Sequence, residues 1–364
     1  MLPIENEHEV RAAMEVHKPA SIKDIARAAN VSHSTVSRAL RNSPLVSRET
    51  TQRIQKIAED SGYRVSAVAR SLATRETKTI GVVVTSVRDP FVAEVVTGIE
   101  NMAINHGYSV FLASCNAEAV REAKVVQIFE ERRVDGIIVM DSRVGSLYAA
   151  HLSKMKIPIV LINKFRFGEF MYSVAIDNLT ASREATTHLI QLGHTRVAYI
   201  GDRDGFQSDT DRFGGYRQAL EHADIPFQPH LVAHGDGKPA GGEEAAEQLL
   251  RLPERPTGIF CFNDMTALGV LHALRSHKLR VPEDVSVVGF DDLFFAPYTY
   301  PPLTTVKQPK EHMGRLATEI VLKLLAGTSC EYNVKVQGEL VIRESTGPLS
   351  EESEYERKGR RPRS

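Results

Sequence analysis

The sequence contains no tryptophan and only three cysteines among its 364 residues: Cys115, Cys261 and Cys330. The cysteines lie far apart and form no CxxC pair, which argues against both a disulfide framework and a zinc site. A reducing cytosol is the simplest compartment for such a chain. No apolar run reaches the ~18 residues that a membrane span needs. The acidic first residues also lack the basic start and apolar middle of a signal peptide.

The common signatures of catalysis are missing as well. The chain has no GxxxxGK[ST] phosphate loop, no GxSxG elbow and no HExxH pair. Its thirteen histidines show no metal-ligand spacing. An enzyme on a flavodoxin-like sheet remains an alternative, but Gly201–Asp202 after VAYIG is only a turn. We therefore expect no catalytic residue, no cofactor and no metal.

Charge is balanced overall and uneven along the chain. A hydrophobic content of 42% and a charged content of 25% are ordinary for a globular protein, and the length favours two or three domains. The net charge is −1, yet residues 21–75 hold ten lysines and arginines against four acidic residues, which is +6 and leaves −7 elsewhere. A basic module on an acidic body is typical of a DNA-binding head joined to a sensor.

Residues 21–42 read SIKDIARAANVSHSTVSRALRN and predict two short helices. The first has one apolar face, made of Ile22, Ile25, Ala26 and Ala29. Asn30 then tolerates a left-handed helix stop, and Ser32 can cap a second helix. That helix turns Val36, Ala39 and Leu40 inward and His33, Ser34, Ser37, Arg38 and Arg41 outward. The pattern predicts a helix-turn-helix; the alternative is a helical hairpin with a solvated basic face.

The outward residues suit DNA. His33 and Ser34 offer hydrogen-bonding groups to the major groove, and Arg38, one turn later, can reach guanine O6 and N7. Ser32, Thr35 and Ser37 are short hydroxyls suited to phosphate, which fixes register without reading sequence. Ser21 and Ser47, which begin the first and third helices, complete the set. The third helix carries Ile54, Ile57 and Ala58 and stops at Gly62.

Three segments together resemble the DNA-binding head and hinge of the lactose-repressor/galactose-repressor (LacI/GalR) family of bacterial transcription regulators: SIKDIARAANVSHSTVSRAL, VSRETTQRI and GYRVSAVARSLA. The resemblance continues to about residue 346. It implies an all-α helix-turn-helix head (20–64) plus a hinge helix (65–76), joined to a two-lobed α/β periplasmic-binding-protein-like effector and dimerisation domain with parallel doubly wound sheets (77–348). Residues 1–19 and 349–364 are expected to be disordered tails.

The hinge departs from the family pattern, which has Pro and then Asn where this chain has Val65 and Ser66. Ser66 can still cap a short helix that includes Ala69. By resemblance, two hinge helices enter the minor groove and Leu72 wedges between base pairs, at a cost of a few kcal/mol that contacts to bent DNA offset. The alternative is a plain linker whose leucine packs on its own body.

From residue 79 the sequence alternates short apolar strands with helices, which predicts parallel sheets covered on both faces. Strands are expected at 80–85, 108–114, 136–140, 158–162, 197–201, 258–262 and 285–290. Helices are expected near 91–106, 118–133, 145–155, 179–192, 211–223, 241–252 and 264–277. The pattern restarts after VAIDN, which gives two α/β lobes of similar plan.

The last part of the chain is expected to return through both lobes. Residues 301–309 cross between the lobes, a helix spans 310–325, and a strand lies near 334–342. The resemblance implies an N-lobe of about 77–177 and 307–332 and a C-lobe of about 178–303 and 333–346, with three crossovers suited to closure over a ligand. The chain end lacks the leucine heptad of tetrameric members, which favours a homodimer.

Ligands of open α/β sheets bind beyond the carboxyl ends of the strands. By resemblance, effector-contacting positions fall on Asn163, Arg212, Asn263 and Asp291, with Phe91 as a packing aromatic. Thr85 and Phe206 add to this set. Arg212 and Asp291 can grip vicinal hydroxyls, which sugars offer. Asn163 stands where many members have Asp, and an amide both donates and accepts.

Alternative roles remain open for single residues. Asp291 and Asn263 would then only cap the segments that follow them. Arg212 would pair at the surface with Asp209 or Asp211. His194 is expected to be a structural loop residue.

The predicted function is a sequence-specific transcription regulator, a repressor by default, that binds double-stranded pseudo-palindromic operator DNA as a homodimer. A small-molecule effector, a sugar or sugar derivative, controls its operator affinity. The alternative is a transport or sensor binding protein without a DNA role. The basic head and the missing export signal argue against that alternative, and no membrane partner is expected.

Overall fold

The computed structural model describes residues 20–63, 76–142, 157–164, 172–203, 205 and 207–349. The chain divides into two units, Met1–Thr77 and Lys78–Ser364. Both tails, the hinge with Ser66, Ala69 and Leu72, the expected helix at 145–155, and Phe206 lie outside the described residues. Among the described residues, no helix is long and apolar enough to cross a membrane.

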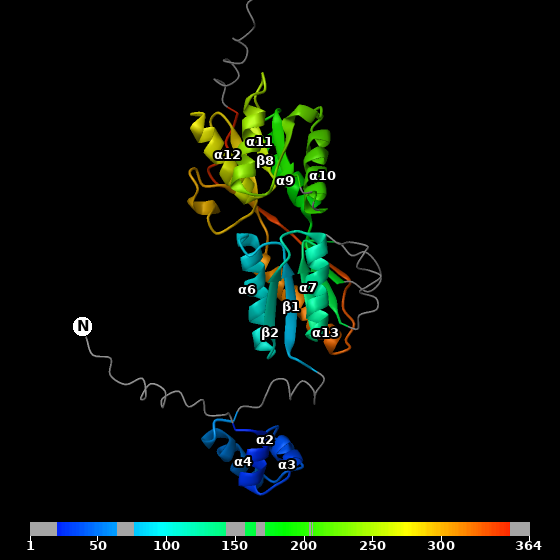
Figure 1. The fold of residues 1–364 in the computed structure, drawn as a ribbon. Coiled ribbons are helices and arrows are strands. Elements are labelled where there is room, and N and C mark those ends of the chain that lie inside the picture. The colour runs from blue at the N-terminus through cyan, green and yellow to red at the C-terminus, as the bar shows by residue number, and fades with distance from the viewer. Residues whose placement is uncertain are drawn as a thin grey trace, which may run out of the picture. The chain divides into compact units, whose positions relative to one another are not determined.

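The first unit contains the predicted three helices (Figure 1): α2 (Ile22–Ala29), α3 (His33–Ala39) and α4 (Arg48–Asp60). Each helix begins at the serine that the sequence indicates. Ser21, Ser32 and Ser47 accept hydrogen bonds from backbone amides three residues on, and Ser21 forms a capping box with Asp24. Asn30 closes α2 in the left-handed conformation, as predicted, with φ 52°.

A small apolar core joins these helices: Ile25, Ala26, Ala29, Val36, Ala39, Ile54 and Ala58. Gly62 has φ +64° just beyond α4, so it supplies the predicted stop. The inward face of α3 is thus fixed by packing, and its other face is left to solvent.

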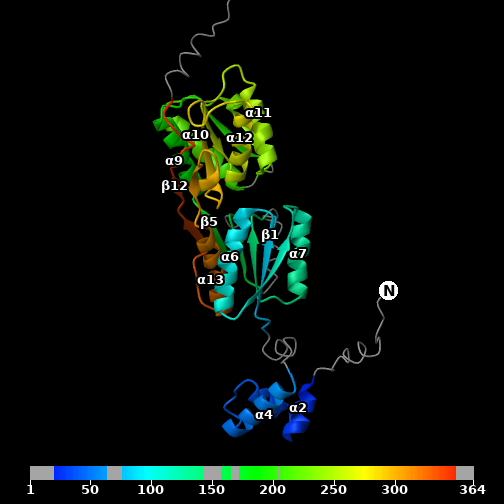
Figure 2. The same cartoon turned by 90° about the vertical axis from the view of Figure 1, so that its left-hand side faces the viewer.

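The N-lobe of the second unit is built on a six-stranded parallel sheet ordered β11–β5–β4–β3–β1–β2. Its strands are β1 (Thr79–Val84), β2 (Ser109–Ser114), β3 (Gly136–Met140), β4 (Ile159–Ile162), β5 (Tyr172–Ile176) and β11 (Asn333–Val336). Helices α6 (Pro90–Asn105) and α13 (Lys310–Leu325) cover one face, and α7 (Ala119–Glu131) covers the other (Figure 2).

The C-lobe repeats this plan with the strand order β12–β10–β9–β8–β6–β7. Its strands are β6 (Val197–Asp202), β7 (Val232–Gly235), β8 (Gly258–Cys261), β9 (Ser286–Asp291), β10 (Thr304–Lys307) and β12 (Glu339–Val341). Its helices are α9 (Asn178–Gln191) and α10 (Gln207–His222) on one face, and α11 (Pro239–Leu250) and α12 (Asp264–Ser276) on the other (Figure 2). Two 3-10 turns follow at η1 (Pro229–Leu231) and η2 (Ala296–Tyr298).

The return passage differs from the expected single strand at 334–342. It forms two strands in different sheets: β11 pairs with β5 in the N-lobe, and β12 pairs antiparallel with β10 in the C-lobe. The expected start of the C-lobe portion at residue 333 is therefore wrong, because β11 completes the N-lobe. The crossing falls at Gln337–Gly338, where a Cβ on Gly338 would lie 2.8 Å from Ile176 Cδ1.

Three strands were not predicted, namely β5, β7 and β10. β10 lies in the segment expected only to cross between lobes, and it pairs with β9 and β12. Short strands with half-polar sequences such as TTVK carry too little apolar signal to stand out from a connection. The predicted positions of the other strands agree with the structure to within two residues at either end.

Helices α6 and α13 approach each other closely through two glycines. A Cβ on Gly98 would lie 2.1 Å from Glu311 O, and a Cβ on Gly314 would lie 2.1 Å from Val95 O. Only glycine permits this backbone contact. It fixes the start of α13, and with it Lys310, against the helix that begins at the cleft.

Candidate DNA-reading helix and effector cleft

The exposed face of α3 carries the residues predicted to read DNA. His33, Ser34, Arg38 and Arg41 are exposed, and Ser37 is half-buried. Arg41 donates hydrogen bonds from Nε to Ser37 O and from a terminal guanidinium nitrogen to Ser37 Oγ, both 3.0 Å. Within the described residues, the Arg38 guanidinium has no such partner. Arg38 is therefore the arginine of this face whose donors stay available to a base edge.

Two of the three hydroxyls predicted to bind phosphate, Ser32 and Thr35, lie together at the start of α3, whereas Ser37 contacts Arg41. Ser32 Oγ lies 2.7 Å from Ser34 Oγ and 2.8 Å from Thr35 Oγ1, and it accepts the Thr35 amide at 3.2 Å. A helix N-terminus with hydroxyls and free amides suits an anionic phosphate oxygen. The placement agrees with the predicted role, which stays a prediction in the absence of DNA.

Replacing Arg38 with alanine is expected to weaken binding to a preferred duplex by about 1–3 kcal/mol and to relax base preference at one position of each half-site. The reason is the loss of a bidentate donor to guanine. Binding by sequence selection and by titration of single-base variants measures both effects. Lys56→Ala removes the same charge from an exposed position on α4 and serves as the control. Equal loss on all sequences would contradict the reading role.

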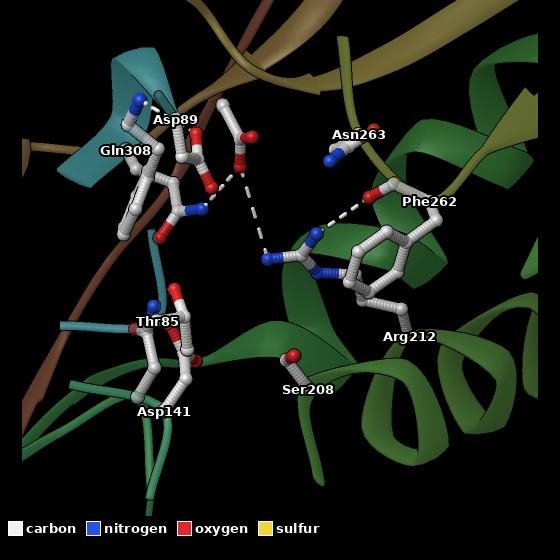
Figure 3. A pocket seen from close by; sticks show the side chains of 11 residues that line it. Thr85, Asp89, Asp141, Ser208, Arg212, Phe262, Asn263 and Gln308 are labelled. Carbon is white, nitrogen blue, oxygen red and sulfur yellow. Dashed lines mark hydrogen bonds and ion pairs between the residues drawn. The ribbon is translucent and has the colours of Figure 1, made fainter. Parts of the chain in front are cut away.

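A cleft lies between the N-lobe and the C-lobe (Figure 3). Its lining combines six of the seven predicted effector residues with five others: Thr85, Phe91, Asn163, Arg212, Asn263 and Asp291, and Asp89, Asp141, Ser208, Phe262 and Gln308. Most of these side chains follow strand ends or helix starts, as expected for open α/β sheets.

Arg212 is the central cation of the cleft, and only 3% of it is exposed. Its Nε donates to Asn178 Oδ1 at 2.8 Å, and another guanidinium nitrogen donates to Phe262 O. The guanidinium lies over the Phe290 ring, 3.7 Å from the centroid, and 4.7 Å from the Phe262 centroid. The alternative in which Arg212 pairs at the surface with Asp209 or Asp211 is wrong. Arg212 stands in the second turn of α10 rather than at its start.

Asp291 faces Arg212 at the end of β9. Its Oδ1 lies 3.9 Å from an Arg212 nitrogen and accepts a hydrogen bond from Gln308 Nε2 at 2.6 Å (Figure 3). Its backbone has φ +117°, a conformation that L-residues rarely adopt and that is typical of strained functional positions. Asp291 does not act as a helix cap, so this alternative does not hold.

Asn263 caps a helix, and its predicted contact with an effector stays a prediction. Its Oδ1 accepts the Thr266 amide at 2.8 Å as the cap of α12, and its Nδ2 donates to Gly237 O at 3.0 Å. It also lines the cleft. His194 is structural, as expected: it is 2% exposed, and its Nε2 lies 3.0 Å from Ser286 Oγ and 3.1 Å from Gly347 O.

The N-lobe wall of the cleft is rich in hydrogen-bond acceptors. Asp141 and Asn163 each follow a strand, β3 and β4, in the left-handed conformation, with φ 47° and 59°. A hydrogen bond joins Asp141 to the Asn163 side chain. Asp89 caps α6 by accepting the Phe91 amide at 2.9 Å, which places the buried Phe91 ring beside it. Asp141 could have been predicted, because it follows GIIVM just as Asn163 follows PIVLI.

Burial raises the pKa of all three cleft carboxyls. The pKa of Asp141 rises to about 7, because of burial first and then the charge of Asp89. Burial also raises the pKa of Asp291 to about 7, against the opposing charge of Arg212. The pKa of Asp89 is raised by burial. Arg212 is the one cationic side chain among the lining residues, so the lining carries excess negative charge when all three carboxyls ionise.

The raised pKa of Asp141 should make the free energy of unfolding of the ligand-free protein depend on pH. Because the folded Asp141 binds its proton more tightly than the unfolded residue does, its contribution is full below about pH 4 and is lost as pH rises through about 7. The loss approaches about 4 kcal/mol at most. Thermal unfolding between about pH 5.5 and 8 should show a smaller fall for Asp141→Asn than for the parent chain.

The control for this measurement is Asp284→Asn. Hydrogen bonds from Arg280 lower the pKa of Asp284, so its contribution is present above about pH 4 and does not change between about pH 5.5 and 8. This variant should give a curve parallel to that of the parent. Parallel curves for the Asp141 variant and the parent would contradict the assigned burial effect.

The three cysteines are free thiols, two of them buried. In the part of the chain that the structure describes, no group of three or more His, Cys, Asp or Glu side chains could hold a metal ion.

A helix-turn-helix unit followed by a two-lobed α/β unit with a polar interlobe cleft defines a class of DNA-binding regulators that carry a ligand-binding body. Residues 21–66 match the bacterial regulatory proteins of the lacI family, and residues 186–346 match the periplasmic binding protein-like domain. The HTH-type transcriptional repressor CytR of Escherichia coli (strain K12) is 36% identical over 331 residues, which cover 91% of this chain and 97% of CytR. The chain belongs to the lacI family, which confirms the resemblance.

Solved structures agree with this assignment. The lac repressor dimer bound to operator and the anti-inducer ONPF is 27% identical and superposes with a TM-score of 0.82, covering 92% of this chain and 100% of that one. The complex of the transcriptional regulator CelR with cellobiose is 29% identical, with a TM-score of 0.68 and coverage of 90% and 99%.

Proposed function

We propose that the chain is a repressor that binds a pseudo-palindromic operator as a homodimer and that a small molecule in the interlobe cleft controls this binding. The observation that supports this proposal is that one chain combines an exposed helix, on which Arg38 has no hydrogen-bond partner among the described residues, with a cleft lined by a buried arginine and three carboxyls. Two identical heads would read two half-sites related by a two-fold axis.

The proposed control works through lobe closure. Arg212, Asn263 and Asp291 come from the C-lobe, and Thr85, Phe91 and Asn163 come from the N-lobe, so a ligand that contacts both walls favours their approach. A ligand shifts the balance between two states only by its difference in affinity for them. Gln308 reaches Asp291 from the crossover segment, so closure would move a connection between the lobes.

A carbohydrate is the proposed ligand class. The cleft is concave and enclosed by side chains from both lobes, as small-molecule sites are. Its lining offers polar groups from both lobes with one aromatic on each side, Phe91 and Phe262. The structural relative CelR was solved with cellobiose. The proposal assigns binding without turnover to this cleft.

Two measurements on the full-length protein test the proposal. Selection from random duplexes should enrich a symmetric sequence, and no enrichment over random competitor would overturn the DNA role. A thermal-shift screen of sugars should then find a ligand, which adds about 2.7 kcal/mol of stability at 100-fold its Kd. That ligand should change the affinity for the selected duplex and should be recovered chemically intact.

A further inference from the structure

Acidic side chains outnumber basic ones in the lining of the cleft. Among its lining residues, Asp89, Asp141 and Asp291 face a single cationic side chain, Arg212. Asp291 lies 3.9 Å from Arg212. Asp89 and Asp141 belong to the N-lobe (Figure 3), whose share of the described lining includes no cationic side chain. The charge of Asp89 opposes ionisation of both Asp141 and Asp291.

Arg212 is held on the C-lobe side of the cleft by contacts within its own lobe. Its Nε donates to Asn178 Oδ1, a second guanidinium nitrogen donates to Phe262 O, and the third nitrogen lies 3.9 Å from Asp291 Oδ1 as an ion pair. The planar guanidinium is also held between the Phe262 and Phe290 rings. These contacts fix the guanidinium in the C-lobe. A ligand would therefore have to bring its own positive charge to the carboxyls of the N-lobe wall.

Two amide oxygens of the lining could also accept hydrogen bonds from a ligand. Asn163 Oδ1 and Gln308 Oε1 are buried without a hydrogen-bond partner among the described residues. The other end of each amide is already committed, Asn163 to Asp141 and Gln308 to Asp291. An unsatisfied buried acceptor costs about 1–3 kcal/mol, so a ligand that donates to these oxygens recovers that energy.

We infer that the effector is an amino sugar whose ammonium group binds the N-lobe wall at Asp141 and Asp89, and that the cleft excludes phosphorylated sugars. The inference rests on the proposed function, because it concerns the same cleft. An ammonium offers three donors, carries no acceptor and supplies the missing positive charge. A phosphate would bring up to two further negative charges against three carboxyls.

Proton release is a second consequence of the same arrangement. Burial raises the pKa of Asp141 to about 7, with Asp89 and Asp291 adding to the rise and Arg212 and Asn163 opposing it. An ammonium beside this carboxyl favours its ionised form, so binding at pH 7 should release protons to the buffer. A neutral hydroxyl in the same place carries no charge to favour the ionised carboxyl, so its binding should release no protons.

The test uses the full-length protein and matched sugars that differ in one group. The probes are glucose, glucosamine and glucose 6-phosphate, and the corresponding forms of galactose and mannose. Titration calorimetry in two buffers of different ionisation enthalpy gives both the affinity and the protons released. In at least one set, the amino form should bind at least about ten-fold more tightly than the hydroxyl form, as expected for one charged hydrogen bond. The phosphate form should not bind, and the amino form should release protons.

Variants separate this role from a structural one. Asp141→Asn should reduce the preference for the amino form to less than about three-fold and should abolish proton release. The reason is that asparagine has neither the negative charge that attracts an ammonium nor a proton to release. Asp89→Asn provides the same comparison if the first variant does not fold. Glu100→Gln, at an exposed position of α6, should keep the parent preference.

Three results would overturn the inference: equal or tighter binding of the hydroxyl or phosphate form, no binding by any probe, or an unchanged preference in both aspartate variants. Enrichment of a symmetric duplex, measured on the same protein, tests the proposed DNA role separately. Failure of the amino-sugar assignment can thus be told apart from failure of the regulator assignment.

Discussion

Lys310→Met is expected to lower the free energy of unfolding of the two-lobed unit by about 3–5 kcal/mol, the usual cost of removing one partner from a buried ionic group. Only 5% of Lys310 is exposed. Its Nζ donates to Asp291 O and Asp292 O, both at 2.7 Å, and lies 3.2 Å from Glu94 Oε2. Methionine keeps the side-chain length but leaves two carbonyls and a carboxylate without their cation.

Loss of these hydrogen bonds should also weaken the connection between the N-lobe and the C-lobe. Lys310 begins α13 in the N-lobe, whereas both carbonyls belong to the end of β9 in the C-lobe. Urea unfolding followed by circular dichroism measures the stability change. Lys323→Met on the same helix removes an exposed lysine that pairs with Glu319 at 2.7 Å, and it should cost less than about 1 kcal/mol. Similar costs for both variants would refute the buried role of Lys310.

The second large effect is expected from Asp291→Asn, which should weaken effector binding by about 100-fold, or about 3 kcal/mol, the upper range for hydrogen bonds to a charged group. Asparagine keeps an oxygen that can accept from Gln308 Nε2 but removes the negative charge that faces Arg212. The fold should persist, because the variant removes a buried charge whose pKa is raised to about 7.

Operator binding and its response to ligand should separate in this variant. The head is a distinct unit, so preference for the selected duplex should remain, while the effector no longer alters it. Asp224→Asn, at an exposed position with φ 54° that asparagine tolerates, serves as the control. An Asp291 variant that still responds at the parent's effector concentration would show that the carboxyl does not contact the ligand.

The sequence was most informative where local chemistry decides structure. Ser32, Asn30 and Gly62 predicted helix boundaries because a cap or a left-handed stop depends on a few neighbouring residues. The bounds of α13 were likewise predicted to the residue, because its apolar residues recur at helical spacing over 16 residues. Six of the seven predicted effector residues meet in one cleft, and Phe206 lies outside the described residues.

What the sequence missed depends on contacts between distant segments. Asn178 and Gln308 lie far from Arg212 and Asp291 along the chain, and only the crossovers bring them together. The split of the return strand into β11 and β12 is also a tertiary outcome, because each half pairs with a different sheet. The position of Asp141 could have been predicted from strand ends alone. The raised pKa of its carboxyl could not, because it depends on burial and on the nearby charge of Asp89.

The late position of β11 and β12 bears on how the protein is made. β11 forms the edge of the N-lobe sheet beside β5, and β12 forms the edge of the C-lobe sheet beside β10. Both strands lie within residues 333–341, so a ribosome must translate beyond residue 332 before either sheet can receive its final strand. Nascent chains stalled before residue 333 should therefore present two unpaired sheet edges to chaperones, whereas the head, complete by residue 63, can fold far earlier.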